Sequence, residues 1–122
     1  MCFEYDETPE FTTMRVSKAR KQHRCSVCRR AIVPGEVYGY YSGKFDGEFS
    51  TDHVCRRCEY DIVRIVEHEL AEGCRWSEAW PAFCDVAEYL ENSGLGRTPF
   101  DAVPATFKVG DRPKQPQTSK AD

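Results

Sequence analysis

The sequence of 122 residues has no run of about 18 apolar residues, the length that a membrane-spanning helix needs. Its first residues, Met-Cys-Phe-Glu-Tyr-Asp-Glu, are acidic and lack the apolar stretch of a secretory signal peptide. We therefore expect no contact with a membrane and a location in a reducing cytoplasm, where disulfides are rare. The cysteine count of seven is odd, which also disfavours a complete disulfide framework.

Acidic side chains are missing from one segment, residues 15–30. That segment holds seven basic residues, although the whole chain carries a net charge of -3. A basic segment on an acidic body predicts a local cationic face, suited to phosphates or to an acidic protein. The alternative is that these charges neutralise nearby groups and are otherwise solvated.

The strongest motif is a pair of CxxC sequences, Cys25/Cys28 and Cys55/Cys58, separated by 26 residues. A thioredoxin-like redox pair would need a βαβ context, which the surrounding sequence lacks. Four thiolates in tetrahedral geometry satisfy one Zn²⁺ ion, and the x2 spacing lets both sulfurs of a pair reach it. The spacing predicts one structural Zn²⁺ ion bound by Cys25, Cys28, Cys55 and Cys58.

The histidines and the other cysteines leave alternatives open. His53 lies two residues before Cys55 and either replaces a cysteine ligand or points from a strand face. The three cysteines without pair spacing either form a second metal site with His68 or, as we favour, pack as core thiols. They are Cys2, Cys74 and Cys84.

Local patterns predict a hairpin followed by two helices. Residues 36–42 and 48–54 are rich in strand formers and flank an Asp-Gly turn signal, with Phe49, Thr51 and His53 on one face. Apolar spacing predicts helices over residues 56–72 and 81–93, each followed by a glycine. Residues 15–24 form either a short helix or an extended lead-in.

These elements predict a small α+β protein built as a zinc-stapled treble clef: a zinc knuckle, a β-hairpin and a helix. We divide the chain into an acidic N-terminal arm (1–14), a treble-clef zinc-binding module (15–73), an appended helical region (74–96) and an extended or disordered tail (97–122). In the tail, Phe100, Val103, Phe107 and Val109 are candidates to dock as an extended segment.

A closed four-thiolate site keeps no open position for substrate, so we expect a non-enzymatic binding protein. The favoured partner is a protein, contacted through the helix pair and the acidic body. The alternative is a nucleic acid, bound by the basic segment and hairpin aromatics. The weakest alternative is an HNH-like metal-dependent nuclease, whose motif would begin at Asp52-His53. The candidate binding residues are Arg15, Lys18, Arg20, Lys21, Arg24, Arg29, Arg30, Tyr40 and Phe45.

The stretch from Lys18 to Cys58 resembles small zinc-finger proteins encoded by bacteriophages and prophages. The residues that carry the resemblance are Ala19-Arg20-Lys21, Cys25/Cys28, Ile32, Pro34-Gly35-Glu36, Tyr38, Ser42-Gly43, Asp46-Gly47, Phe49 and Cys55/Cys58. The resemblance covers about a third of the chain and implies a bacterial host cytoplasm. It also implies action on a host macromolecule, for example inhibition of a defence or nucleic-acid-handling complex, while that family has no assigned activity.

Overall fold

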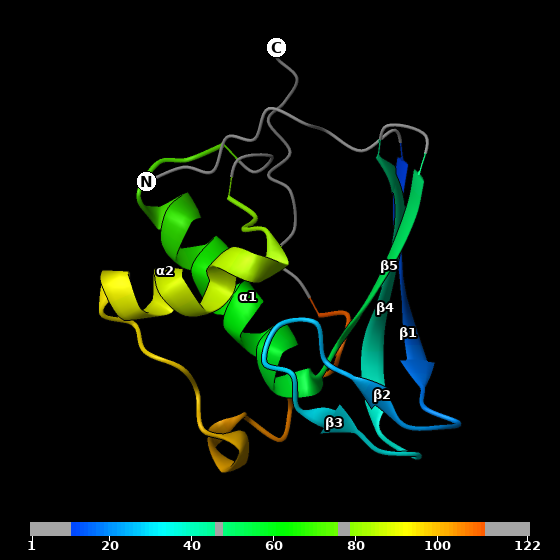
Figure 1. Cartoon of the computed structure of the whole chain (residues 1–122). Coiled ribbons are helices and arrows are strands. Elements are labelled where there is room, and N and C mark those ends of the chain that lie inside the picture. Colours follow the sequence, from blue (N-terminus) through cyan, green and yellow to red (C-terminus); the bar gives the residue numbers. More distant parts are fainter. Residues whose placement is uncertain (1–10, 46–47, 76–78, 112–122) are drawn as a thin grey trace.

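The protein is described by a computed structural model that covers residues 11–45, 48–75 and 79–111. Its centre is a three-stranded antiparallel sheet in the order β1-β4-β5, formed by Phe11–Lys18, Val37–Phe45 and Glu48–Val54. Helix α1 (Arg56–Ala71) follows β5 after one residue and packs on one face of this sheet (Figure 1). The predicted α+β class with an antiparallel sheet and helices is confirmed.

The predicted hairpin is present, with a longer first strand and a shorter connection than expected. Strand β4 continues to Phe45 and β5 begins at Glu48, so only residues 46–47, which lie outside the described chain, join them. The predicted turn at Pro34-Gly35 is confirmed, because the Glu36 amide donates to the Val33 carbonyl at 3.1 Å and Gly35 has φ 97°.

Between residues 15 and 24 the chain is extended rather than helical. Strand β1 pairs with β4 from Phe11 to Lys18, so the expected boundary after residue 14 falls inside a strand. The short strands β2 (His23–Arg24) and β3 (Ala31–Ile32) then form a second two-stranded sheet. A helix is excluded because residues 15–18 are held in the ladder with β4 and residues 23–24 pair with β3.

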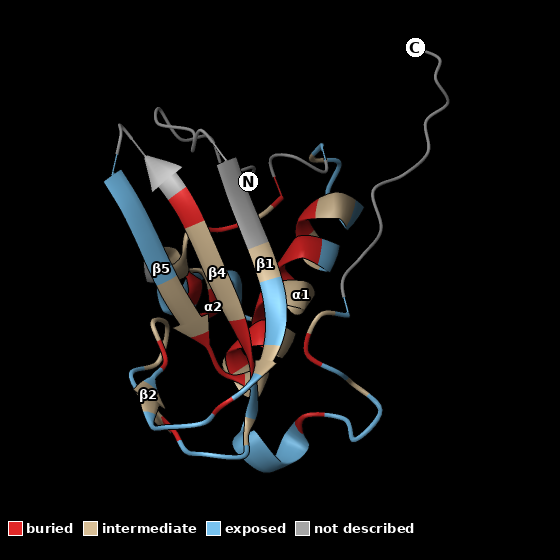
Figure 2. Cartoon of the chain, turned by 90° about the vertical axis from the view of Figure 1, so that its right-hand side faces the viewer, coloured by how far each residue is buried: buried red, intermediate tan, exposed pale blue. Residues whose placement is uncertain are grey.

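The two faces of the three-stranded sheet differ in their surroundings. The odd-numbered residues of β4 face α1, since the Tyr41 hydroxyl donates to the Glu59 carboxylate at 2.6 Å. The even-numbered residues face away from it, and the ring of Tyr40 lies there against that of His53. Figure 2 views the sheet from this second side, which none of the described helices covers. We call it the outer sheet face.

Both predicted helices exist, and the second is shorter than expected. Helix α1 ends before Gly73, which has φ 102° as a C-terminal glycine should. The segment predicted as one helix over 81–93 divides into a 3-10 turn, η2 (Phe83–Asp85), and helix α2 (Val86–Ser93). Ala82 precedes η2 without a side-chain cap, and Pro81 has no amide hydrogen to donate. None of the described helices has the length and apolar character to cross a membrane.

After α2, the chain returns along α1 instead of leaving the domain. Thr98, Val103 and Val109 are buried, and a short 3-10 turn, η3 (Phe100–Ala102), lies between them. Phe100 itself remains half exposed, so docking is confirmed for Val103 and Val109 and not for Phe100. The tail from residue 112 lies outside the described residues.

Three carboxylates of α1 belong to the interior, where the sequence suggested an acidic surface. The exposed fractions of Glu59, Asp61 and Glu69 are 1%, 0% and 0%. They share the helix face that also buries Ile62, Ile65 and Val66. These three carboxylates therefore do not contribute to an acidic surface, because each lies under other elements of the same chain.

Gly39 on β4 leaves the space that the Glu59 carboxylate occupies. A Cβ atom at residue 39 would lie 2.3 Å from Oε2 of Glu59, far inside van der Waals contact. We expect Gly39→Ala to lower the free energy of unfolding by about 1–3 kcal/mol, because a buried carboxylate must move. Urea denaturation measures this, and a variant as stable as the parent would contradict the packing described.

Candidate metal centre

The first CxxC pair lies at the tip that joins β2 to β3. The chain reverses tightly there, because the Cys25 amide donates to the Arg30 carbonyl at 2.9 Å and the Arg29 amide donates to the Cys25 carbonyl at 3.0 Å. Arg29 adopts φ 66°, the left-handed conformation that this reversal requires. This knuckle directs both sulfurs toward the beginning of α1.

The second pair is placed by the junction of β5 and α1. Cys55 is the N-cap residue of α1 and Cys58 lies in its first turn, so both sulfurs point to the same end of the helix. The knuckle is fixed to this junction, since the Ser26 amide donates to the His53 carbonyl at 2.7 Å. A backbone link therefore aligns the two pairs.

The four sulfurs form a compact group suited to one metal ion. Their positions all lie within 4.8 Å of one another, and Sγ of Cys28 is 3.8 Å from Sγ of Cys55. Sulfurs at about 2.3 Å from a tetrahedral zinc ion are separated by about 3.8 Å. Cys25, Cys55 and Cys58 are buried, so a bound ion would be shielded from solvent. Among the described residues, no other group of potential ligands converges in this way.

Hydrogen bonds within the sulfur group shift the pKa values of Cys25, Cys55 and Cys58. Hydrogen bonds from Cys55 and Cys58 lower the pKa of Cys25 well below its usual range. The hydrogen bond between Cys25 and Cys55 raises the pKa of Cys55 to about 11. The hydrogen bond between Cys25 and Cys58 raises the pKa of Cys58 further still. Four adjacent thiolates need a cation to offset their charge.

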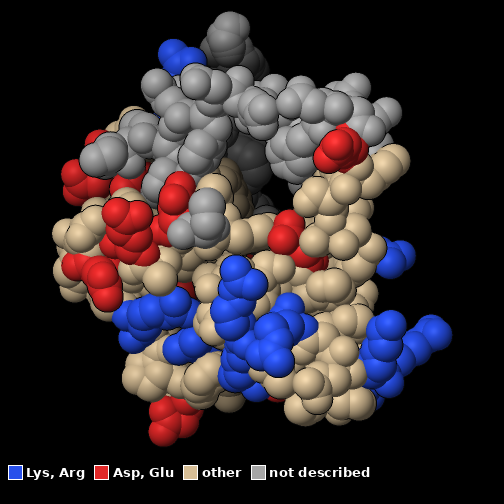
Figure 3. Space-filling model, in the orientation of Figure 1, with Lys and Arg blue, Asp and Glu red and all other residues tan. Residues whose placement is uncertain are grey.

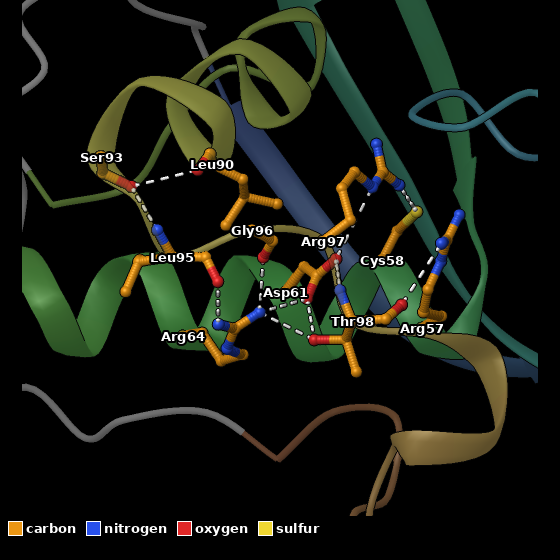
Figure 4. A network of polar contacts seen from close by, with 10 residues as sticks. All are labelled: Arg57, Cys58, Asp61, Arg64, Leu90, Ser93, Leu95, Gly96, Arg97 and Thr98. Atoms are coloured by element: carbon orange, nitrogen blue, oxygen red, sulfur yellow. Dashed lines mark hydrogen bonds and ion pairs between the residues drawn. The ribbon is translucent and has the colours of Figure 1, made fainter.

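Arginines surround the sulfurs and offset negative charge on them. Burial alone would lower the pKa of Arg57, but its hydrogen bond to Cys28 and the nearby sulfurs raise that pKa overall. Arg97, 39 residues beyond Cys58, donates from Nη2 to Sγ of Cys58 at 3.3 Å (Figure 4). Nothing in the spacing of the sequence indicates Arg97 as a neighbour of the sulfurs.

Asp61 holds Arg97 in place. Its buried carboxylate lies 3.8 Å from Nε of Arg97 and 3.0 Å from Nη1 of Arg64, and it accepts hydrogen bonds from both the amide and the hydroxyl of Thr98. Figure 4 shows these groups converging on one side chain. The segment after α2 is thereby tied to the helix that carries Cys55 and Cys58.

His53 is not part of the sulfur group. Its ring stacks on that of His23, with centroids 4.3 Å apart and planes 15° apart, and both lie against Tyr38 on the outer sheet face. Burial, then the neighbouring His23, lowers the pKa of His53. The alternative in which His53 replaces a cysteine ligand is therefore not supported, and the strand-face alternative is.

The cysteines outside the two pairs do not extend the metal site within the described chain. Cys74 is disulfide-bonded, which corrects the expectation that it packs as a core thiol. Its partner is none of the four clustered cysteines, which are all free. Nδ1 of His68 instead lies 2.9 Å from the hydroxyl oxygen of Tyr89. Cys2 and the side chain of Cys84 are outside the described part.

The basic segment divides between two sides of the molecule. Four of its basic residues line a cleft of about 680 Å³ together with Val16, Ser17, His23 and Tyr38. These four are Arg15, Lys18, Arg20 and Lys21. We call this the basic cleft. Figure 3 shows Lys and Arg gathered toward the end of the molecule that carries β2 and β3, whereas most Asp and Glu lie beside α1 and α2.

The other predicted binding residues lie elsewhere. Arg24 and Arg29 are exposed at the knuckle, where Nη1 of Arg24 donates to the Arg29 carbonyl at 2.7 Å. Arg30 forms an ion pair with Glu36 at 3.0 Å and lies over the ring of Phe100. Tyr40 lies on the outer sheet face, 5.0 Å from the guanidinium of Arg15. The side chain of Phe45 is not among those described.

Comparison with protein-family models, with curated proteins and with solved structures gives no match to this chain. The resemblance of residues 18–58 to phage zinc-finger proteins therefore stays a prediction.

Proposed function

We propose that this chain is a non-enzymatic zinc-binding protein with a treble-clef module, and that it binds a nucleic acid through the basic cleft. Zinc is the ion that four thiolates in tetrahedral geometry favour among the common cellular metals. The order of knuckle, hairpin and helix, with a cysteine pair at each end, supports the treble-clef assignment. Ile32 and Val54, both buried, join the sulfurs to the core, so the ion would also stabilise the fold.

The site itself favours a structural role for the ion. Four thiolates complete a tetrahedral coordination shell, whereas a catalytic zinc keeps a position for water or substrate. An HNH-like arrangement is not supported by the side chains near Asp52-His53. The ring of His53 is stacked on His23, and Asp52 alternates to the other face of the sheet.

The basic cleft carries the proposal of nucleic-acid binding. Its four cationic side chains are all exposed, and no acidic residue is among the described residues that line it. Lysine and arginine grouped in this way bind phosphates and release the counterions condensed on a nucleic acid. With a net charge of -3, the chain as a whole has no long-range attraction for nucleic acid, so binding depends on this local surface.

The proposal predicts a specific loss of affinity on charge reversal. At about 0.1 M salt, the double variant Lys18→Glu/Lys21→Glu is expected to bind a fluorescent oligonucleotide at least about tenfold more weakly than the parent. The slope of log affinity against log salt should also decrease, because fewer counterions are released. Fluorescence anisotropy measures both quantities.

Arg75→Glu is the matched control, because Arg75 is exposed beyond the far end of α1 and outside the cleft. The control should keep nearly the parent affinity. The control changes the net charge by 2 and the double variant changes it by 4. A control loss of about half that of the double variant on a logarithmic scale would therefore show that net charge alone acts, and it would contradict the role of the cleft. Absence of any salt-dependent binding by the parent would reject the proposal.

A basic protein is a second candidate partner. A pocket of about 510 Å³ between α1 and α2 is lined by Asp85 and Glu88, together with His68 and Tyr89. Its acidic lining favours a cationic side chain of a partner. Capture from bacterial lysate with and without nuclease treatment separates the candidates, since a direct protein partner survives the nuclease and a nucleic acid does not.

A further inference from the structure

We propose that the outer sheet face is a stacking platform for single-stranded nucleic acid, with the basic cleft holding the adjoining phosphates. This inference depends on the proposed function and narrows its ligand from nucleic acid in general to an unpaired strand. It assigns a separate role to Tyr40, His53 and Phe49, which lie on that face and outside the lining of the cleft.

The outer sheet face carries no acidic side chain among its described residues. The strand registers place eight of them on it: Arg15, Ser17, Tyr38, Tyr40, Ser42, Phe49, Thr51 and His53. Glu48 and Asp52 alternate with these residues and belong to the other face. A polyanion can therefore lie along the outer face without meeting a carboxylate of β4 or β5.

Aromatic rings on this face are accessible to solvent, and the guanidinium of Arg15 lies beside one of them. Phe49 is 69% exposed, and Tyr40 and His53 are partly exposed on neighbouring strands. The Arg15 guanidinium lies 5.0 Å from the centroid of the Tyr40 ring, so one positive charge lies beside an aromatic surface. Aromatic rings bind bases by stacking, and an adjacent arginine can reach the phosphate of the same nucleotide.

The platform is continuous with the basic cleft. Arg15, Ser17 and Tyr38 belong to both surfaces, and His23 connects them because it lines the cleft and stacks on His53. A bound strand therefore meets cations at one end of the sheet and rings along its face. An unpaired strand is required, because the bases of a duplex already stack on one another and cannot present their faces to these rings.

The test uses a 12-nucleotide single strand of thymidine, an abasic strand of equal length and a 12-base-pair duplex, each measured by fluorescence anisotropy. The parent is expected to bind the thymidine strand more tightly than either of the others. Tyr40→Leu should weaken binding of the thymidine strand by about fivefold to more than a hundredfold, the range for loss of one stacked base. The salt slope and the affinity for the abasic strand should stay near the parent values.

Tyr60→Leu is the control, because Tyr60 is a partly buried tyrosine on α1 whose ring lies 5.2 Å from Phe107, away from the outer sheet face. Urea denaturation of both variants separates loss of folding from loss of stacking. If the parent binds the abasic strand or the duplex as tightly as the thymidine strand, the platform is contradicted and binding by the cleft survives. If the parent binds none of the three probes, both proposals fail. Dimerisation that is lost in Tyr40→Leu would assign the face to a second copy of the chain and would also overturn the inference.

Discussion

Replacement of Cys58 by serine is expected to abolish stable zinc binding and, with it, cooperative unfolding. Cys58 is buried, and its sulfur belongs to the four-sulfur group. A structural zinc ion contributes about 10–16 kcal/mol of apparent binding energy, whereas a whole domain is stable by only about 5–15 kcal/mol. Loss of one of the four ligands therefore removes an energy comparable to the total stability. Metal analysis of the purified variant and its thermal melt by circular dichroism measure the effect.

Ser26→Ala is the matched control, because Ser26 lies between the ligands of the first pair and offers no sulfur. It should keep its zinc and lose about 1 kcal/mol, since its hydroxyl accepts one hydrogen bond from the His53 amide at 3.3 Å. Treatment of the parent with a strong chelator should reproduce the Cys58→Ser melt. A Cys58→Ser chain that melts cooperatively at the parent temperature would show that the fold does not depend on the site.

Asp61→Asn is expected to lower the free energy of unfolding by about 3 kcal/mol. The substitution keeps the size of the side chain and removes the charge that Arg64 and Arg97 face. Its amide group cannot accept from all of the present donors, so a guanidinium or the Thr98 hydroxyl loses a partner. The segment after α2 should then detach from α1, and Arg97 should leave the Cys58 sulfur. Urea denaturation measures the free energy of unfolding. The affinity for the metal ion reports the loss of the hydrogen bond from Arg97 to the Cys58 sulfur.

Glu67→Gln provides the comparison, because it makes the same chemical change at an exposed position of the same helix. That substitution should alter stability by no more than about 0.5 kcal/mol. Equal effects of the two substitutions would contradict the account of Asp61 as the residue that fastens the C-terminal segment. A loss of stability in Asp61→Asn with unchanged metal affinity would limit its role to the fold.

The parts of the fold that follow from local chemistry could be predicted from the sequence. The turn at Gly35, the end of α1 before Gly73 and the strand β5 each depend on neighbouring residues, so their signals lie within a few positions. The cysteine pairs belong to the same class, since an x2 spacing restricts two sulfurs to one side of a turn. Their convergence from 26 residues apart was inferred from the hairpin between them, and the structure confirms it.

The buried carboxylates show what local patterns could not supply. Asp61 is an ordinary surface residue by type, and its burial depends on Thr98 and Arg97, which the chain brings back only after α2. Glu59 is buried because Gly39, on a strand earlier in the sequence, leaves space for its carboxylate. In both cases the decisive partner is distant in sequence and has no periodic relation to the acid.

The histidines that precede the two CxxC pairs have a related explanation. From its position two residues before Cys55, His53 is an alternative ligand by sequence alone. Strand alternation turns the side chain of His53 to the outer sheet face, and the pairing of β2 with β3 brings His23 over it. The two rings therefore contact each other and Tyr38 rather than the sulfurs.

X-ray absorption spectroscopy of the purified protein tests the central claim most directly, because it identifies the ion and its ligand atoms together. The account predicts one zinc ion per chain with four sulfur neighbours at about 2.3 Å and no nitrogen in the first shell. A shell that contains an imidazole nitrogen would return His53 or His23 to the metal, and a protein without a bound metal would contradict the account as a whole.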